Sequence, residues 1–279
     1  VYALLQPPVY KAEALLLPPK AKDVKSINLA LNEVDSSGNK EAQLRRVSGI
    51  TASQAFGAFK KNLTSRSLQK KFIEEHSLMN VLAPNRTPET RDIEILESFA
   101  EMIKFEDKEG FSVSVESSDP EFAAKLVNDY VSFFDLETVR GMVSDAKNNI
   151  EEQILDIEYS IASKRQMAKQ RREDQVVRYQ EASKIAHTLG IKKRVDATNI
   201  IQNTQMNVDI ATASTPLYYL GIEALSAKIE ILQNRKSDDP FISGLRDLQE
   251  QLALLRSFKI YGKGMHSVSI DQAAYPPKN

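Results

Sequence analysis

The chain contains no cysteine, which excludes a disulfide framework and a cysteine-based metal site. This absence fits the cytoplasm, and it fits equally a bacterial envelope protein that folds without disulfides. The three histidines, His76, His187 and His266, have no partner at the spacing of metal ligands, which favours surface or capping roles over a metal site. The sequence therefore predicts neither a metal nor a cofactor.

Long apolar runs and glycine are also scarce. No segment reaches the run of about 18 apolar residues that a transmembrane helix needs. Only 10 of the 279 residues are glycine, which favours long helices over a turn-rich β architecture. The formal net charge is -1, so no excess of positive charge attracts nucleic acid or lipid headgroups, and nucleic acid is not an expected partner.

Motifs for catalysis are missing as well. The chain has no G-x-S-x-G motif, and the Gly-Lys-Gly stretch at 262–264 lacks the upstream glycine and the following Ser or Thr of a phosphate-binding loop, so we interpret it as a connector. Asp238-Asp239 could be paired carboxylates for acid–base chemistry, but their position before Pro240 favours a helix cap. The sequence predicts a protein that is not an enzyme.

The first 118 residues predict a mixed α/β base. Residues 9–16 alternate apolar and polar side chains, as in a half-buried strand that Pro18-Pro19 would stop. Thr51 followed by Gln54 resembles a capping box that begins a helix. The pattern also predicts a turn at 36–39, helices at about 67–76 and 89–100, a loop at 83–88, and a hairpin at 103–115 that turns at Gly110.

A very long helix is predicted after Ser118. Asp119 is its expected N-cap with Pro120 at the first position, and from there to Gly190 the chain has no proline and only one internal glycine, Gly141. A helix of about 70 residues would be about 100 Å long, more than the width of a compact domain, so we expect a rod that extends from the base. Its apolar stripe follows an eleven-residue repeat, close to the natural helix period: Val139, Val143, Ala146, Ile150, Ile154, Ile157 and Ile161.

The chain after Gly190 predicts shorter helices and a last strand. A helix is expected at about 192–208, followed by two stretches with heptad spacing that form either an αα-hairpin or helices returning alongside the long helix. Asp239 is expected to cap the second stretch, and residues 267–271 are expected to form a strand that pairs with the strand near residue 10. The two apolar seams are Tyr218, Ile222, Leu225, Ile229 and Leu232, and then Phe241, Leu245, Leu248, Leu252 and Leu255.

Together these patterns predict an α+β fold in three segments. Residues 1–118 form the base, residues 119–260 the long helix with the returning helices, and residues 261–279 the final strand with a Pro-rich exit. The side chains expected to pack the helices together or against another copy are Ile150, Ile154, Ile157, Ile161, Leu225, Leu232, Leu245 and Leu252.

Both chain ends are expected to return to the base. The chain begins with Val1, which suggests a piece of a longer protein, and Pro pairs lie near each end. We interpret the two ends as the remains of transmembrane helices, because proline stops a helix from continuing into the base. Pro276, Pro277 and Lys278 are then expected next to the membrane.

The densest run of charges on a predicted helix lies at 163–180, where Arg165 and Arg172 take positions of the apolar stripe. One interpretation is a solvated helix face. The other is a surface where Arg165, Arg171 and Arg172 meet an anionic or hydroxyl-rich polymer or a neighbouring copy. A nucleic-acid surface is less favoured, because no aromatic side chains are interleaved in the basic core of the run.

Four stretches resemble the periplasmic domain of Wzz-type chain-length determinants, the class 1 polysaccharide co-polymerases of Gram-negative bacteria. They are YKAEALLLPP after the first membrane span, DPEFAAKLVNDYV at the start of the long helix, PLYYLGIEALSAKIEILQNRKSDDPFISGLRDLQEQLALL, and the Pro-rich end at 274–278. The third is the most specific, because its Gly, Asn-Arg and Asp-Pro-Phe residues fall in the order of the family. The likeness spans nearly the whole chain and is less clear at 24–50 and 160–215. The extended charged middle resembles members associated with very long O-antigen.

The resemblance implies a non-enzymatic protein with two membrane spans, cytoplasmic termini and this domain in the periplasm. Such proteins form ring-like homo-oligomers in the inner membrane. They set the modal length of the lipopolysaccharide O-antigen made by the Wzy-type polymerase, so the polymerase and the polysaccharide are the implied partners. The alternative is a periplasmic coiled-coil adaptor of a secretion or efflux system. That alternative needs two antiparallel helices of similar length, whereas the return path here is broken at Gly190, Pro216 and Pro240.

Overall fold

The computed structural model describes residues 8–25, 27, 49–84, 86–87, 91–107, 110–195 and 216–277. The chain divides into two compact units. The first unit contains Val1–Gln153 and Leu254–Asn279, and the second contains Ile154–Ala253. The turn predicted at 36–39 lies outside the described residues. The boundaries between the predicted segments 1–118, 119–260 and 261–279 fall between helices and strands and not inside them. As a division into domains, the three segments stay a prediction.

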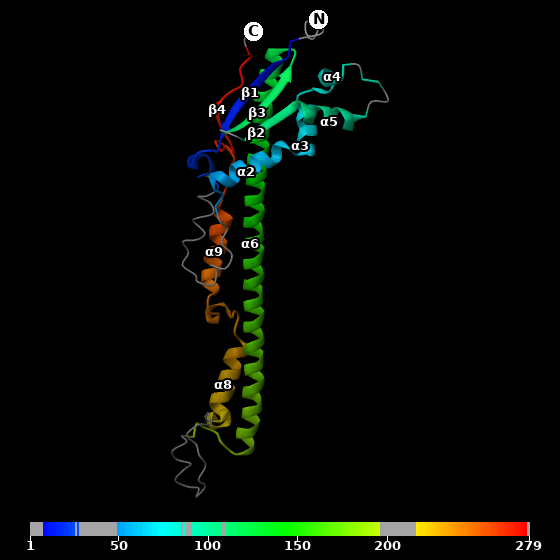
Figure 1. Ribbon diagram of the computed structural model, residues 1–279. Coiled ribbons are helices and arrows are strands. Elements are labelled where there is room, and N and C mark those ends of the chain that lie inside the picture. Colours follow the sequence, from blue (N-terminus) through cyan, green and yellow to red (C-terminus); the bar gives the residue numbers. More distant parts are fainter. Residues whose placement is uncertain are drawn as a thin grey trace. The chain divides into compact units, whose positions relative to one another are not determined.

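A four-stranded antiparallel sheet forms one layer of the first unit (Figure 1). Its strands are β1 (Tyr10–Leu17), β2 (Ile103–Asp107), β3 (Phe111–Ser117) and β4 (Ser269–Gln272), in the order β2-β3-β1-β4. The alternation of β1 places Ala12, Ala14 and Leu16 in the core. The predicted first strand, the hairpin and the pairing of the last strand with the first are therefore confirmed, and so is the α+β fold.

Several short helices also belong to the described part of this unit. They are η2 (Ala21–Val24), α2 (Ala52–Leu63), α3 (Arg66–Glu75), α4 (Met79–Leu82) and α5 (Asp92–Met102). The capping box that begins α2 is confirmed, because Gln54 N donates to Thr51 Oγ1 at 3.1 Å and Thr51 N donates to Gln54 Oε1 at 2.8 Å. The sequence did not indicate η2 or α4, since a single turn shows no apolar period.

Aromatic side chains dominate the core of the first unit. Phe59, Phe72, Phe99, Tyr130 and Phe134 are fully buried, and several of their rings are in edge or tilted contact. The Tyr130 hydroxyl donates to the carbonyl of residue 63 at 2.5 Å. Burial raises the pKa of Tyr130, so the phenol stays neutral and keeps this donor role at physiological pH.

One helix, α6 (Pro120–Thr188), continues for 69 residues, or about 100 Å at about 1.5 Å per residue. Asp119 caps it as predicted, since its Oδ1 accepts from the backbone N of Glu121 at 3.0 Å and of Phe122 at 3.1 Å. The helix ends at Thr188, and the chain turns away at Gly190, whose φ is +68°, where Ile191 N donates back to the carbonyl of residue 186. Among the described residues, no helix combines the length and the apolar character needed to cross a membrane.

The end of the chain is tied to the start of α6 within the first unit. Asn128 donates from Nδ2 to the Ala274 carbonyl at 2.9 Å, and its Oδ1 accepts from Ala274 N at 3.0 Å. Two turns further along, the Asp135 carboxylate accepts from His266 Nδ1 at 2.8 Å and from both N and Oγ of Ser267. The Asp135 bonds hold the connector that precedes β4 and the Asn128 bonds hold the segment that follows it, so the last strand is anchored to α6 on both sides.

The second unit is built on the C-terminal part of α6. It also contains η4 (Leu217–Leu220), α8 (Gly221–Gln233), η5 (Asp239–Phe241) and most of α9 (Leu245–Ser257). Leu225 of α8 is buried in one cluster with Ala182 and Ala186 of α6, so α8 lies alongside this part of α6 (Figure 1). For α8, the helix that returns alongside the long helix is the correct alternative.

The helix predicted at 192–208 is wrong for its first residues, because residues 191–195 are not helical. Their backbone pairs with the start of α8: the carbonyls of Ile191 and Lys192 accept from the N–H groups of Ile222 and Glu223 at 3.1 and 3.2 Å. The first N–H groups of a helix have no partner within it, so these bonds outweigh the helical propensity of the segment. Residues 196–208 lie outside the described residues.

We predict that Gly221→Ala destabilises the second unit by more than about 1 kcal/mol. Gly221 has a φ of +80°, and a Cβ there would lie 2.5 Å from the carbonyl carbon of Lys193. Amide hydrogen exchange should show faster exchange of Ile222 and Glu223. The matched control is Gly141→Ala in α6, where a Cβ meets nothing within 4 Å and should stabilise by about 0.5–1 kcal/mol. Equal effects of the two substitutions would contradict this account.

Candidate functional site

Five charged side chains of the second unit, Arg165, Arg172, Arg235, Asp238 and Asp239, form what we call the Arg–Asp cluster. Two come from α6 and three from the segment between α8 and α9. Arg165 donates from Nε to Asp239 Oδ1 at 2.9 Å and from Nη2 to Asp239 Oδ2 at 2.6 Å. This fork-to-carboxylate geometry is the strongest and most directional form of an ion pair.

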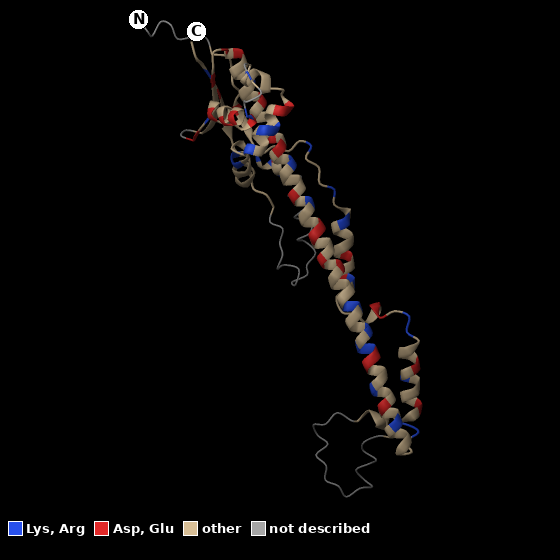
Figure 2. Cartoon of the chain, turned by 90° about the vertical axis from the view of Figure 1, so that its right-hand side faces the viewer, with Lys and Arg blue, Asp and Glu red and all other residues tan. Residues whose placement is uncertain are grey.

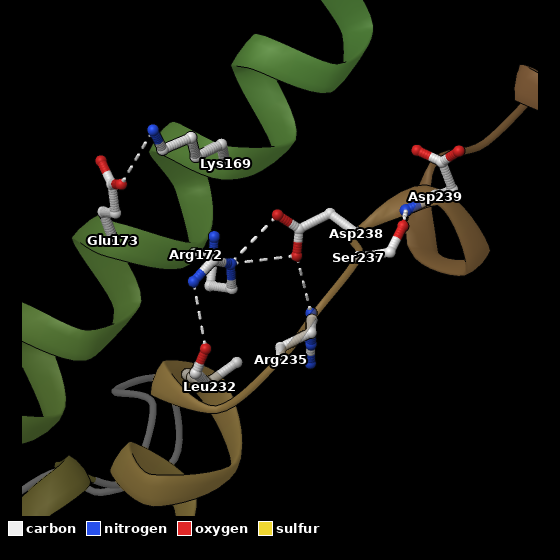
Figure 3. Close-up of polar contacts among 8 residues, drawn as sticks. All are labelled: Lys169, Arg172, Glu173, Leu232, Arg235, Ser237, Asp238 and Asp239. Atoms are coloured by element: carbon white, nitrogen blue, oxygen red, sulfur yellow. Dashed lines mark hydrogen bonds and ion pairs between the residues drawn. The ribbon is translucent and has the colours of Figure 1, made fainter.

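The second ion pair of the cluster, between Arg172 and Asp238, is drawn in Figure 3, and it is more buried than the first. Arg172 Nε lies 3.1 and 3.0 Å from the two oxygens of Asp238, and Arg172 Nη1 donates to the Leu232 carbonyl at 3.1 Å. Only 19% of the Arg172 side chain and 12% of the Asp238 side chain are exposed. Arg235 also donates to Asp238, at 3.4 Å, so one carboxylate faces two guanidinium groups.

The capping role predicted for Asp238-Asp239 is wrong. Neither side chain caps a helix: η5 is only three residues long, α9 begins at Leu245, and both carboxylates are bound to arginines of α6. A charge-assisted pair to guanidinium is stronger than a bond to a single backbone N–H, which explains the outcome. Phe241 likewise does not belong to the second apolar seam. Its side chain is 67% exposed, and the Arg235 guanidinium lies 3.9 Å from its ring centroid.

Ion pairing changes the ionisation of the outer pair. The hydrogen bond from Arg165 lowers the pKa of Asp239, against a smaller opposing effect of burial, and the charges of Arg165 and Arg246 add to it. The same bond raises the pKa of Arg165. Because the folded pKa of Asp239 is depressed, its contribution to stability is present above the unfolded pKa and is lost as pH falls through the folded value.

A pocket of about 450 Å³ lies beside the cluster, between residues 163–175 of α6 and residues 235–243. Its charged lining consists of four cations and one carboxylate: Lys164, Arg171, Arg172, Arg235 and Asp238. Lys164 donates to the Ser243 carbonyl at 3.2 Å. The predicted contact of Arg165, Arg171 and Arg172 with a polymer stays a prediction. The structure adds that two of the three are paired within the chain.

The side chains predicted to pack the helices, on α6 and on the returning helices, are covered by other parts of the same chain. Ile150, Ile157, Ile161, Leu225, Leu232 and Leu245 are buried, and Ile154 and Leu252 are half-buried. Whether they also contact another copy stays a prediction, as does the place of Pro276 and Pro277 next to a membrane. Lys278 lies outside the described residues.

Exposed apolar side chains on the second unit's part of α6 escaped the sequence analysis. Leu155, Tyr159 and Val177 are 47–74% exposed. At about 100° per residue, these three lie about 120–160° around the helix in one direction from Ile161, the last residue of the apolar stripe, whereas the exposed Met167 and Ile185 lie about 120° around in the other direction. Charges of both signs alternate with them along α6 (Figure 2). A second, sparser apolar line at helical spacing is the signal that could have revealed them.

Solved structures described as polysaccharide co-polymerases or O-antigen chain-length regulators have a similar fold. A full-length bacterial polysaccharide co-polymerase matches with a TM-score of 0.57 at 17% identity, covering 100% of this chain and 79% of its own. The wild-type lipopolysaccharide O-antigen chain-length regulator WzzBSF of Shigella flexneri matches with 0.60 at 16%, covering 97% and 99%. A Wzz dodecamer fitted to a cryo-EM map matches with 0.53 at 15%, covering 97% and 98%.

The chain has the fold of the Wzz-type chain-length regulators. The resemblance carried by the four sequence stretches is confirmed at the level of the fold, over nearly the whole chain. No protein-family model and no curated protein sequence matches the chain. Identities of 15–17% explain why only short motifs carried the likeness, since the Wzz-type fold is retained with most side chains changed.

We predict that Asp238→Asn weakens the attachment of α8 by about 1–3 kcal/mol, because Arg172 and Arg235 lose their shared counter-charge. Amides in the last turn of α8 should exchange about tenfold faster or more. The control is Glu173→Gln, which removes an exposed i,i+4 pair with Lys169 at 3.9 Å (Figure 3) and should cost no more than about 0.5 kcal/mol. If the two substitutions accelerate exchange equally, the cluster does not hold α8.

We also predict that an NMR titration finds the pKa of Asp239 below the ordinary value of about 3.9. In Arg165→Gln this pKa should rise towards the ordinary value, because the carboxylate loses its main hydrogen-bond donor. Arg178→Gln, an exposed arginine on the same helix, should leave it unchanged. A pKa of Asp239 that does not respond to Arg165→Gln would show that the pair is not formed in solution.

Proposed function

We propose that this chain is the periplasmic domain of a non-enzymatic regulator of lipopolysaccharide O-antigen chain length. One observation carries the proposal: structures described as O-antigen chain-length regulators share the fold over 97–98% of this chain. One of them is described as the periplasmic domain of a chain-length regulator. On this basis the domain works in the periplasm beside the inner membrane, with the polymerase of the O-antigen as partner.

The proposal includes assembly of several copies into a ring. Leu155, Tyr159 and Val177 leave an apolar line exposed on α6, and exposed apolar lines on soluble domains commonly mark contact surfaces. One of the solved structures with the same fold is described as a Wzz dodecamer. Contacts between different surfaces of identical subunits close into a ring when the rotation fits.

The geometry favours the regulator over the coiled-coil adaptor. An adaptor hairpin needs two antiparallel helices of similar length, whereas α6 has 69 residues and α8 and α9 have 13 each. The charged cluster also serves packing, since its arginines and aspartates bind one another. Because these charges hold the domain together, they fit a scaffold that sets polymer length through its shape better than they fit a catalyst.

The test is deletion of the gene, followed by gel electrophoresis of the lipopolysaccharide. We expect the bands to redistribute, with the preferred length lost and the polymer still made. Complementation with the wild-type gene or with Gly141→Ala should restore the bands, because a Cβ at that position would meet nothing within 4 Å. Complete loss of the polymer on deletion, or unchanged banding, would contradict the proposal.

A further inference from the structure

We infer that the pocket between α6 and residues 235–243 binds an acidic saccharide unit, a sugar ring that carries a carboxylate. Its volume of about 450 Å³ falls within the range of about 300–1,000 Å³ of small-ligand sites. The inference rests on the proposed function for the source of the ligand, the growing polysaccharide. The recognition itself is argued from the side chains that line the pocket.

Positive charge in the pocket exceeds what the protein neutralises. Asp238 is its one acidic lining residue among the described residues, and it is shared by Arg172 and Arg235. Arg171 makes no ion pair or hydrogen bond with the described part of the chain, and Lys164 binds only one backbone carbonyl there. A free guanidinium in a concave site is suited to bind a carboxylate with two parallel hydrogen bonds.

The other lining residues suit a sugar ring better than a bare anion. Ser163, Gln175 and Ser243 supply hydroxyl and amide groups that can exchange hydrogen bonds with sugar hydroxyls. Phe241 lines the same pocket with a largely exposed ring, which offers an apolar surface to the C–H groups of a pyranose. A phosphate ion would use Arg171 and Lys164 and would leave this ring without a role.

The inferred contact leaves the Arg–Asp cluster intact. Arg171 is exposed and lies beside Arg172 in sequence, yet it takes no part in the pairs to Asp238 and Asp239. A substitution at Arg171 therefore removes a ligand contact without unpairing the segment that forms the pocket wall. This separation makes Arg171 the residue on which the inference can be tested.

The experiment is calorimetric titration of the 279-residue chain with trigalacturonic acid, with maltotriose as the neutral probe and inorganic phosphate as the bare anion. We expect the acidic trisaccharide to bind, maltotriose to bind at least about tenfold more weakly, and phosphate not to displace the sugar. Arg171→Gln should weaken the binding of trigalacturonic acid about tenfold or more, as expected for a charge-assisted hydrogen bond. The matched control Arg178→Gln, two helical turns later and outside the pocket, should change it less than twofold.

Several outcomes would overturn the inference. They are no binding of the acidic trisaccharide, displacement by phosphate at equal concentration, or equal loss in Arg178→Gln, which would indicate non-specific attraction. A smaller oligomer in Arg171→Gln with unchanged sugar binding would assign Arg171 to contact between copies instead. Normal redistribution of lipopolysaccharide bands on gene deletion without sugar binding would defeat this inference alone. Sugar binding with unaltered banding would defeat the proposed function alone.

Discussion

The structure depends on one constraint, that a helix of 69 residues cannot bury its own apolar side. Each unit covers its part of α6 in a different way. In the first unit, Tyr130 and Phe134 enter a core of aromatic rings. In the second, Ala182 and Ala186 lie against Leu225 of a short returning helix. The chain therefore covers α6 with several separate segments.

Between the apolar contacts of the second unit, arginines replace aliphatic side chains on the same side of α6. Arg165 and Arg172 continue the spacing of Ile157 and Ile161, and they reach carboxylates that no leucine could contact. Arg172 binds Asp238 and a carbonyl at the end of α8 together, which lysine could not do with the same planar geometry. The segment between α8 and α9, which has little regular structure, is thus held against α6 by directional ion pairs and hydrogen bonds instead of apolar burial.

The sequence predicted the parts of the fold whose signals are local. Alternation in residues 9–16, the capping box at Thr51 and the Asp-Pro start of α6 each depend on neighbouring residues, and each was confirmed. Residues 192–195 and Asp238-Asp239 were misjudged, because their partners are distant in the chain. In the sequence, the candidate site was indicated only by a dense run of charged residues. Its ion pairs join residues 66 to 74 positions apart, and no local pattern encodes that pairing.

The two surfaces assigned to α6 in the second unit do not compete. Taking Ile161 as the reference and about 100° per residue, Lys164 and Arg171 lie about 60–80° to one side. Leu155, Tyr159 and Val177 lie about 120–160° to the other side, so the two groups are on roughly opposite flanks of the helix. Copies that pack through the exposed apolar line would leave the basic pocket open. An assembled scaffold could then hold an acidic polysaccharide at the same time. The apolar stripe lies between the two surfaces and packs α6 against the returning helices of its own subunit.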